Sequence, residues 1–210
     1  MSTGQDQLGF DSLLSASDAD NERRRQERDL AHLPGNMEEA LPFYRALIDQ
    51  HHAAMLAGDS VTVQRIRHEA DALALKLNNY QPGILADETA PGCVLARETR
   101  ADDGAVPLWG QEGSFIVTRG AMRVRIEQEG LFGIGSSFMP WPGFSVHAVD
   151  WDKPFLSETG YRSFLGVGGA LEPGHTPETF CAAIIEAYVM RALKGKLRMI
   201  AAQYRRSPPA

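Results

Sequence analysis

Residues 41–77 read LPFYRALIDQHHAAMLAGDSVTVQRIRHEADALALKL and contain two apolar runs with the spacing of an α-helix. Positions three and four residues apart fall on one side of a helix and form a narrow seam. Gly58 separates the runs, because glycine ends a helix in the left-handed conformation and Asp59 or Ser60 can cap the next helix. We therefore predict an antiparallel helical hairpin over residues 36–79. Its seams are Leu41, Tyr44, Ile48, His51 and Met55, then Val63, Ile66, Ala70, Leu73 and Leu77.

The start of the hairpin has two interpretations. Asn36 followed by Glu39 resembles a capping box, which places the first helical residue just after Asn36. Pro42 would then lie too deep in the helix and remove a hydrogen bond. A helix that begins near Leu41 keeps Pro42 in its first turn, and we expect this second start.

The hairpin histidines do not form a metal site. His51 and His52 are adjacent, so their side chains point about 100° apart on a helix, whereas zinc-binding helices place ligands at positions i and i+4. His51 lies on the seam, where we expect a packed, hydrogen-bonded side chain, and His68 reads as a solvated residue. The sequence thus predicts no metal and no cofactor.

The sequence predicts that residues 1–35 form a charged and flexible arm. The segment from Asp18 to Asp29 is almost wholly charged, and its acidic residues offset the three arginines at positions 23–25. We expect a solvated, frayed helix there.

Composition places the chain among ordinary globular proteins, with 43% hydrophobic residues and a formal net charge of −6. An acidic chain is not a general nucleic-acid binder, because phosphate binding needs a local excess of cationic residues. The two cysteines are far apart in sequence and point to a reducing cytoplasm. The sequence contains neither a secretory signal pattern nor a membrane-length apolar run, so we expect a cytoplasmic protein without membrane partners.

Residues 80–210 are expected to form an α+β domain. Turn-forming residues fill 80–113, where we expect connecting structure, one short strand from Cys93 to Arg97, and packing of Leu108 and Trp109 onto the core. Alternating apolar and polar residues then predict an antiparallel sheet. Its expected strands are Phe115 to Thr118, Met122 to Glu127, Leu131 to Met139 and Phe144 to Val149.

A final helix is expected to pack on this sheet. Thr176 is a good N-cap and Pro177 a good first helical residue, and the apolar spacing continues to about Lys194. Consecutive helices followed by consecutive strands favour the α+β class over a doubly wound sheet.

The aromatic segment 141–164 is the candidate small-molecule site. A histidine near a carboxylate can act as a general base, and an arginine can hold an anionic substrate. The candidate catalytic residues are His147, Asp150 and Glu158, and the candidate substrate-binding residues are Trp141, Trp151, Tyr161 and Arg162. The competing interpretation, which we favour, is a structural loop whose aromatic side chains anchor the sheet edge to the final helix.

The end of the chain is basic and is the candidate nucleic-acid interface. A cationic end also complements a helix C-terminus, so a solvated tail explains the same residues. The candidate contacts are Lys194, Lys196, Arg198, Arg205 and Arg206.

Two segments resemble uncharacterised bacterial accessory proteins of the kind found on plasmids and integrated elements. These segments are RALIDQHHAAMLAGD at 45–59 and WDKPFLSETGYRSFLG at 151–166, and the resemblance extends over residues 41–190. It implies an accessory role in a bacterial cell, with no activity or catalytic residue to carry over.

The predicted function is a non-enzymatic, cytoplasmic binding module with a protein or nucleic-acid partner. One alternative is a hydrolase-like enzyme for small molecules with a cleft around residues 147–162, and another is a nucleic-acid binder that uses the basic tail. A homodimer through the seams of the hairpin is also predicted.

Overall fold

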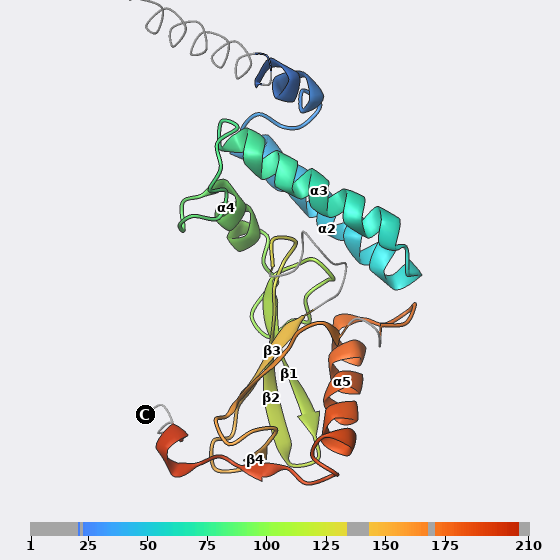
Figure 1. Cartoon of the computed structure of the whole chain (residues 1–210), viewed down its shortest axis with the longest axis vertical. Coiled ribbons are helices and arrows are strands. Elements are labelled where there is room, and N and C mark those ends of the chain that lie inside the picture. The colour runs from blue at the N-terminus through green and yellow to red at the C-terminus, as the bar shows by residue number, and fades with distance from the viewer. Residues whose placement is uncertain (1–20, 22, 134–142, 168–170, 206–210) are drawn as a thin grey trace, which may run out of the picture.

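The computed structural model describes residues 21, 23–133, 143–167 and 171–205, and it has the α+β architecture that the sequence predicts. The helical hairpin and a short third helix lie at one end of the molecule, and the sheet with its long C-terminal helix forms the other end (Figure 1). In chain order the elements are α2 (Met37–Ala57), α3 (Ser60–Leu77), α4 (Pro91–Glu98), β1 (Gly113–Arg119), β2 (Met122–Gln128), β3 (Phe144–Ala148), β4 (Pro154–Phe155), β5 (Tyr161–Phe164), α5 (Pro177–Arg191), β6 (Arg198–Met199) and the 3₁₀ turn η2 (Ala202–Tyr204).

The hairpin begins earlier than expected. Asn36 caps α2 by accepting a hydrogen bond from the backbone N–H of Glu39 at 3.0 Å, so Pro42 lies inside the helix. The expected start near Leu41 is wrong, because the capped first turn forms in spite of the hydrogen bond that Pro42 cannot donate. At the other end Gly58 takes the left-handed conformation, with φ at 73°, and Asp59 caps α3, as predicted.

The seams of the hairpin are packed within the chain. Tyr44, Ile48 and His51 on α2 are buried, as are Ile66 and Leu73 on α3. The same core takes in side chains from outside the hairpin, namely Leu33, Leu95 and Leu131. Most seam residues are thus buried within the chain, and a dimer through the hairpin stays a prediction.

The described part of the N-terminal segment ends against the hairpin. Residues 23–29 are helical and solvent-facing, in keeping with the expected solvated helix. Lys76 of α3 donates hydrogen bonds to the backbone oxygens of Leu30 at 2.9 Å and Leu33 at 2.6 Å. Lys76 thereby holds the segment that follows the short helix against α3.

Residues 91–98 form helix α4, so the predicted strand from Cys93 to Arg97 is wrong. Pro91 occupies the first turn, where its fixed φ suits a helix and its missing N–H costs nothing. Gly92 and Leu95 are both buried, Gly92 against Ile84 and Leu85 of the preceding loop and Leu95 in the core that includes the hairpin. One turn of spacing is too short to distinguish a helix from a strand by pattern.

Four strands form an antiparallel sheet in the order β1, β2, β3, β5. The inner face packs against α5 through Phe115, Ile126, Val146, Phe164 and Phe180. The segment Leu131–Gly133 is a turn and not the expected strand, while 134–139 lie outside the described residues. The expected loop after Pro154 contains β5, which places Tyr161 and Arg162 on opposite faces of the sheet.

Helix α5 and the following segment close the fold. Thr176 caps α5 and Pro177 is its first residue, as predicted, but the helix ends at Arg191. The chain then returns as β6, which pairs with β4 in a separate two-stranded sheet.

Trp109 joins the two ends of the molecule and is buried, as predicted. Its indole N–H donates to the backbone oxygen of His175, just before α5, at 2.7 Å. Its own backbone N–H donates to His52 at 3.1 Å, and its backbone oxygen lies 3.0 Å from Nδ1 of His51.

Candidate binding groove

An open groove of about 850 Å³ runs along the outer face of the sheet, on the side away from α5. One wall comes from α4 and the segments on either side of it, through Leu85, Cys93, Ala96 and Arg100. The other wall is the outer face of β1, β2, β3 and β5. It presents Ser114, Arg125, Glu127, Ser145, Tyr161 and Ser163.

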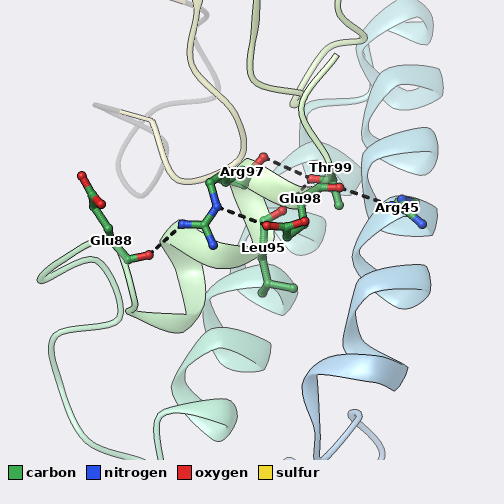
Figure 2. Close-up of polar contacts among 7 residues, drawn as sticks. Arg45, Glu88, Leu95, Arg97, Glu98 and Thr99 are labelled. Atoms are coloured by element: carbon green, nitrogen blue, oxygen red, sulfur yellow. Dashed lines mark hydrogen bonds and ion pairs between the residues drawn. The ribbon is translucent and has the colours of Figure 1, made fainter. Parts of the chain in front are cut away.

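The wall formed by α4 is fixed by polar contacts at both of its flanks (Figure 2). Arg45 of α2 donates to the backbone oxygen of Glu98 at 3.2 Å, which ties the end of α4 to the hairpin. Arg97 donates to the backbone oxygen of Glu88 at 2.9 Å, which ties the helix to the preceding loop. Thr99 closes the last turn by donating to the backbone oxygen of Leu95 at 2.7 Å.

The sheet wall carries a polar cluster centred on Glu127. Its carboxylate lies 2.9 Å from Arg125 and 3.0 Å from Nε2 of His147. Ser145 Oγ lies 3.5 Å from both the Glu127 carboxylate and the same Nε2 atom. The ring of Tyr161 stands beside that of His147, with centroids 5.0 Å apart.

This cluster does not have the geometry of a nucleophilic triad. In a triad the carboxylate binds one ring nitrogen of histidine and the serine binds the other, so that the base can take the serine proton. Here Ser145 and Glu127 both approach Nε2 of His147, and Glu127 is also paired with Arg125. The arrangement suits hydrogen bonding to a ligand at the sheet surface better than proton transfer from the serine.

The three candidate catalytic residues are each engaged by a different partner. His147 contacts Glu127, whereas Asp150 accepts hydrogen bonds from Arg123 at 2.9 and 2.6 Å. The Arg123 guanidinium lowers the pKa of Asp150 to about 2. Glu158 lies 3.4 Å from Arg198 of β6. These contacts do not bring the three side chains into one constellation.

The candidate substrate-binding residues are also separated. Tyr161 lines the groove, but Arg162 lies on the other face of β5, with its guanidinium 4.5 Å from the ring centre of Tyr188. Trp151 packs at the edge of the core and covers Gly160, where an added Cβ would lie 2.4 Å from the indole ring. Trp141 lies outside the described residues. The aromatic segment therefore supplies packing and also several groove residues, namely Gly143, Phe144, Ser145, Tyr161 and Ser163.

The basic residues at the C-terminal end have different surroundings in the structure. Lys194 and Lys196 are exposed in the turn after α5, and Arg198 pairs with Glu158. Arg205 donates from Nε to the backbone oxygen of Ile200 at 3.0 Å. Arg206 lies outside the described residues.

Among the candidate site residues only Tyr161 lines the groove, so sequence reasoning missed most of its lining, including Leu85, Cys93 and Leu165. Leu85 and Cys93 belong to the stretch interpreted as connecting structure, and Leu165 follows directly after the predicted aromatic loop. Only the correct assignment of α4 as a helix would have placed Cys93 opposite the sheet.

The residues that the structure describes hold no cluster of three or more histidine, cysteine, aspartate or glutamate side chains arranged to bind a metal ion. None of the helices in this part of the chain combines the length and the apolar character needed to span a bilayer.

The fold and groove define a small α+β protein with an open polar and apolar groove, and comparison with known proteins relates it to bacterial sequences. The chain is 37% identical over 137 residues to a protein of Escherichia coli named Protein KlcB, a match that covers 64% of this chain. A second Escherichia coli protein of that name is 46% identical over 81 residues, or 39% of this chain. The matches span 33% and 17% of those two proteins, so this chain corresponds to at most about a third of their length. No protein-family model and no solved structure matches the chain.

Proposed function

We propose that this chain is a non-enzymatic interaction module that binds an extended segment of another protein in the groove between α4 and the outer face of the sheet. The observation that carries the proposal is the rim of the groove. Leu85, Tyr161 and Leu165 line it with exposed fractions of 46%, 47% and 63%. Three large apolar side chains gathered around one depression, with polar groups between them, are typical of a surface that binds another polypeptide.

The charges of the groove favour a peptide over a polyanion. Arg100 and Arg125 contribute two positive charges, and Glu112, Glu127 and Glu129 contribute three negative ones. Within this set Arg100 pairs with Glu112 at 3.8 Å, and Arg125 pairs with Glu127 at 2.9 Å. A nucleic acid requires an excess of cationic groups, which this surface lacks.

The polar residues of the sheet wall provide hydrogen bonds to a peptide backbone. Ser114, Ser145 and Ser163 come from three different strands and present hydroxyl groups to the same depression. Each hydroxyl can both donate and accept, so these groups can contact the amide and carbonyl groups of an extended segment. The apolar rim supplies the affinity, and the serines restrict the orientation.

The cellular setting is part of the proposal. The resemblance to bacterial accessory proteins and the similarity to Protein KlcB of Escherichia coli support an accessory role in a bacterial cell. The two thiols, Cys93 and Cys181, are free in the structure, which is in keeping with a reducing cytoplasm.

The test uses peptide binding by the purified chain. A displayed library of random peptides is selected against the wild-type protein, and the enriched peptides are synthesised and titrated by fluorescence polarisation. We expect the affinity to fall at least about tenfold in Leu85→Glu and Leu165→Glu, because each change places a charge in the apolar rim. The matched control is Val61→Glu, at a position on α3 that is 78% exposed and outside the groove.

Three experimental results would contradict the proposal. Selected peptides that bind the rim variants as tightly as the wild type would place the binding surface elsewhere. Salt-dependent retention of DNA that is lost in Lys194→Ala with Lys196→Ala would favour the nucleic-acid alternative. Hydrolysis of a generic ester substrate that is lost in His147→Ala would favour the enzyme alternative.

A further inference from the structure

The seven-residue strand β1 is an open edge of the sheet. It pairs with β2 on one side, and it has no neighbouring strand on the other side within the described part of the chain. Just before the strand the backbone N–H of Ala101 donates to the oxygen of Glu112 at 2.9 Å, so the open stretch begins at Ser114. The backbone N–H of Val149 bonds to the oxygen of Arg123, which shows that the odd-numbered residues of β2 direct their backbone groups toward β3. In an antiparallel ladder this direction alternates, so residues 122, 124, 126 and 128 bond to β1.

The free groups of β1 follow from this alternation. The partners of those β2 residues are Arg119, Val117, Phe115 and Gly113. Ser114, Ile116 and Thr118 therefore direct their N–H and C=O groups away from the sheet. The side chain of Ile116, in the middle, is 53% exposed and lies on the outer face.

The sequence of β1 does not protect this edge. Natural sheets usually block an open edge with a lysine, a proline, a bulge or a very short strand. Within Gly113–Arg119 the only charged residue is Arg119, at the end, and the register with β2 is continuous over all seven pairs. An unprotected edge of this length is a template for pairing with a strand of another chain.

We propose that the chain forms a homodimer in which β1 pairs antiparallel with β1 of a second copy, so that the two sheets become one continuous sheet. The register is centred on Ile116, which lies opposite Ile116 of the other copy, while Ser114 lies opposite Thr118. This register lets all three outward-directed residues of each copy donate and accept a backbone hydrogen bond. No alternative antiparallel register of the same strand pairs all three of them with one another.

The side chains are self-complementary in this register. On the outer face the two Ile116 side chains come together, and serine lies opposite threonine on either side. On the inner face Phe115 lies opposite Val117, which is a favourable aromatic and β-branched pair. Arg119 lies opposite Gly113, so no two like charges face each other.

Helix α5 supports the same assembly. A two-fold axis perpendicular to the sheet keeps both copies of α5 on the inner face. Glu186 of α5 bonds to Arg119 of β1, which identifies the side of the helix that lies toward the edge. Met190 follows Glu186 by one turn and is 57% exposed. A second α5 beside this surface would bury it.

The first experiment compares the oligomeric state of variants by sedimentation equilibrium over a wide concentration range. Ile116→Pro removes an N–H that is free in the single chain. In the dimer each copy donates this N–H to the Ile116 oxygen of the other copy, so the change removes both hydrogen bonds at the axis. Ile116→Lys instead places two like charges opposite each other. We expect the dimer dissociation constant to rise at least about tenfold in both variants. Val61→Lys, an equally charged change at an exposed apolar position on α3, leaves it unchanged.

The second experiment needs no variant, so it does not depend on whether the substituted chains fold. Backbone amide exchange is followed by NMR in the wild-type protein at increasing concentration. We expect the amides of Ser114, Ile116 and Thr118 to become protected together as the dimer forms. A wild-type protein that stays monomeric at high micromolar concentration overturns the proposal. So does a dimer in which these three amides stay unprotected, or one that persists in folded Ile116→Pro.

Discussion

His51 Nε2 accepts a hydrogen bond from Nε of Arg67 at 3.2 Å, and both side chains are buried in the hairpin. Because an arginine N–H can only donate, the lone pair of His51 must lie on Nε2 and its proton on Nδ1. The Nδ1–H group donates to the backbone oxygen of Trp109 at 3.0 Å. His51 is therefore held as the neutral imidazole, and it links the two helices to the segment that leads into the sheet.

This pair makes stability depend on pH. Burial is the main cause that lowers the pKa of His51 from 6.5 to about 4, and the charge of Arg67 adds to it. Between these values the unfolded chain binds a proton that the folded chain does not, so stability is lost as the pH falls. We expect the free energy of unfolding to decrease by on the order of 3 kcal/mol across this window.

The measurement is urea unfolding at a series of pH values from neutral to about 4. His51→Gln keeps an acceptor for Arg67 but does not titrate, so most of the pH dependence is expected to disappear. The pKa of His52 is lowered in the same direction, mainly by burial, so His52→Gln serves as the comparison. A wild-type profile that stays flat, or one that His51→Gln leaves as steep, contradicts the assignment.

The two cysteines are expected to differ in reactivity. Cys93 is partly exposed on the groove wall, whereas Cys181 lies on the buried side of α5, where burial raises the pKa of its thiol. A colourless disulfide reagent that releases a chromophore should label Cys93 rapidly in the folded protein and Cys181 only after unfolding. Cys93→Ser should abolish the rapid phase and leave the slow one. Rapid labelling that survives this change would mean that Cys181 is accessible.

Gly110 cannot accept a side chain. Its φ is 87°, and a Cβ atom would lie 2.7 Å from Nδ1 of His51 and 2.8 Å from Leu131. Gly104 has a similar φ of 80° but no atom within 4 Å of the added Cβ, so Gly104→Ala measures the backbone cost alone. We expect about 1 kcal/mol of destabilisation for Gly104→Ala and about 2 kcal/mol more for Gly110→Ala in thermal or urea unfolding. Equal losses would show that the space around Gly110 adapts without cost.

Asp150 is expected to titrate as the partner of Arg123. Its pKa of about 2 results mainly from the hydrogen bonds that Arg123 donates. In Arg123→Ala this pKa should rise toward 3.8, as followed by NMR of the carboxyl carbon. Arg125→Ala is the control, because Arg125 lies on the same face of β2 but pairs with Glu127. Since the folded pKa is lowered, the stabilisation is complete above 3.8 and is lost as the pH falls toward 2.

The hairpin and the last helix could be predicted because their signals are local. The apolar spacing of the hairpin, its Gly58 break and the Thr176 cap each act within one or two helical turns, and the structure confirms all three. The alternation in the predicted strand Met122 to Glu127 likewise indicated which residues face the core. Helix α4 was missed because its buried face has only two residues, Gly92 and Leu95.

The groove could not be predicted from the pattern of the sequence. Its rim residues Leu85, Tyr161 and Leu165 are up to 80 positions apart, and only the packing of α4 beside the sheet brings them together. The candidates His147, Asp150 and Glu158 were grouped because they are close in sequence. Strand geometry and the arginines at positions 123 and 198 direct them to different partners.

The order of the strands has a consequence for how the chain folds. In the four-stranded sheet each strand pairs with the next one of that sheet along the sequence, so its contacts close short loops and form early. Strand β6 is different, because its partner β4 precedes it by more than 40 residues, with α5 in between. We therefore expect the sheet to assemble first and the β4–β6 pair to close last, as the slow step that completes the native state.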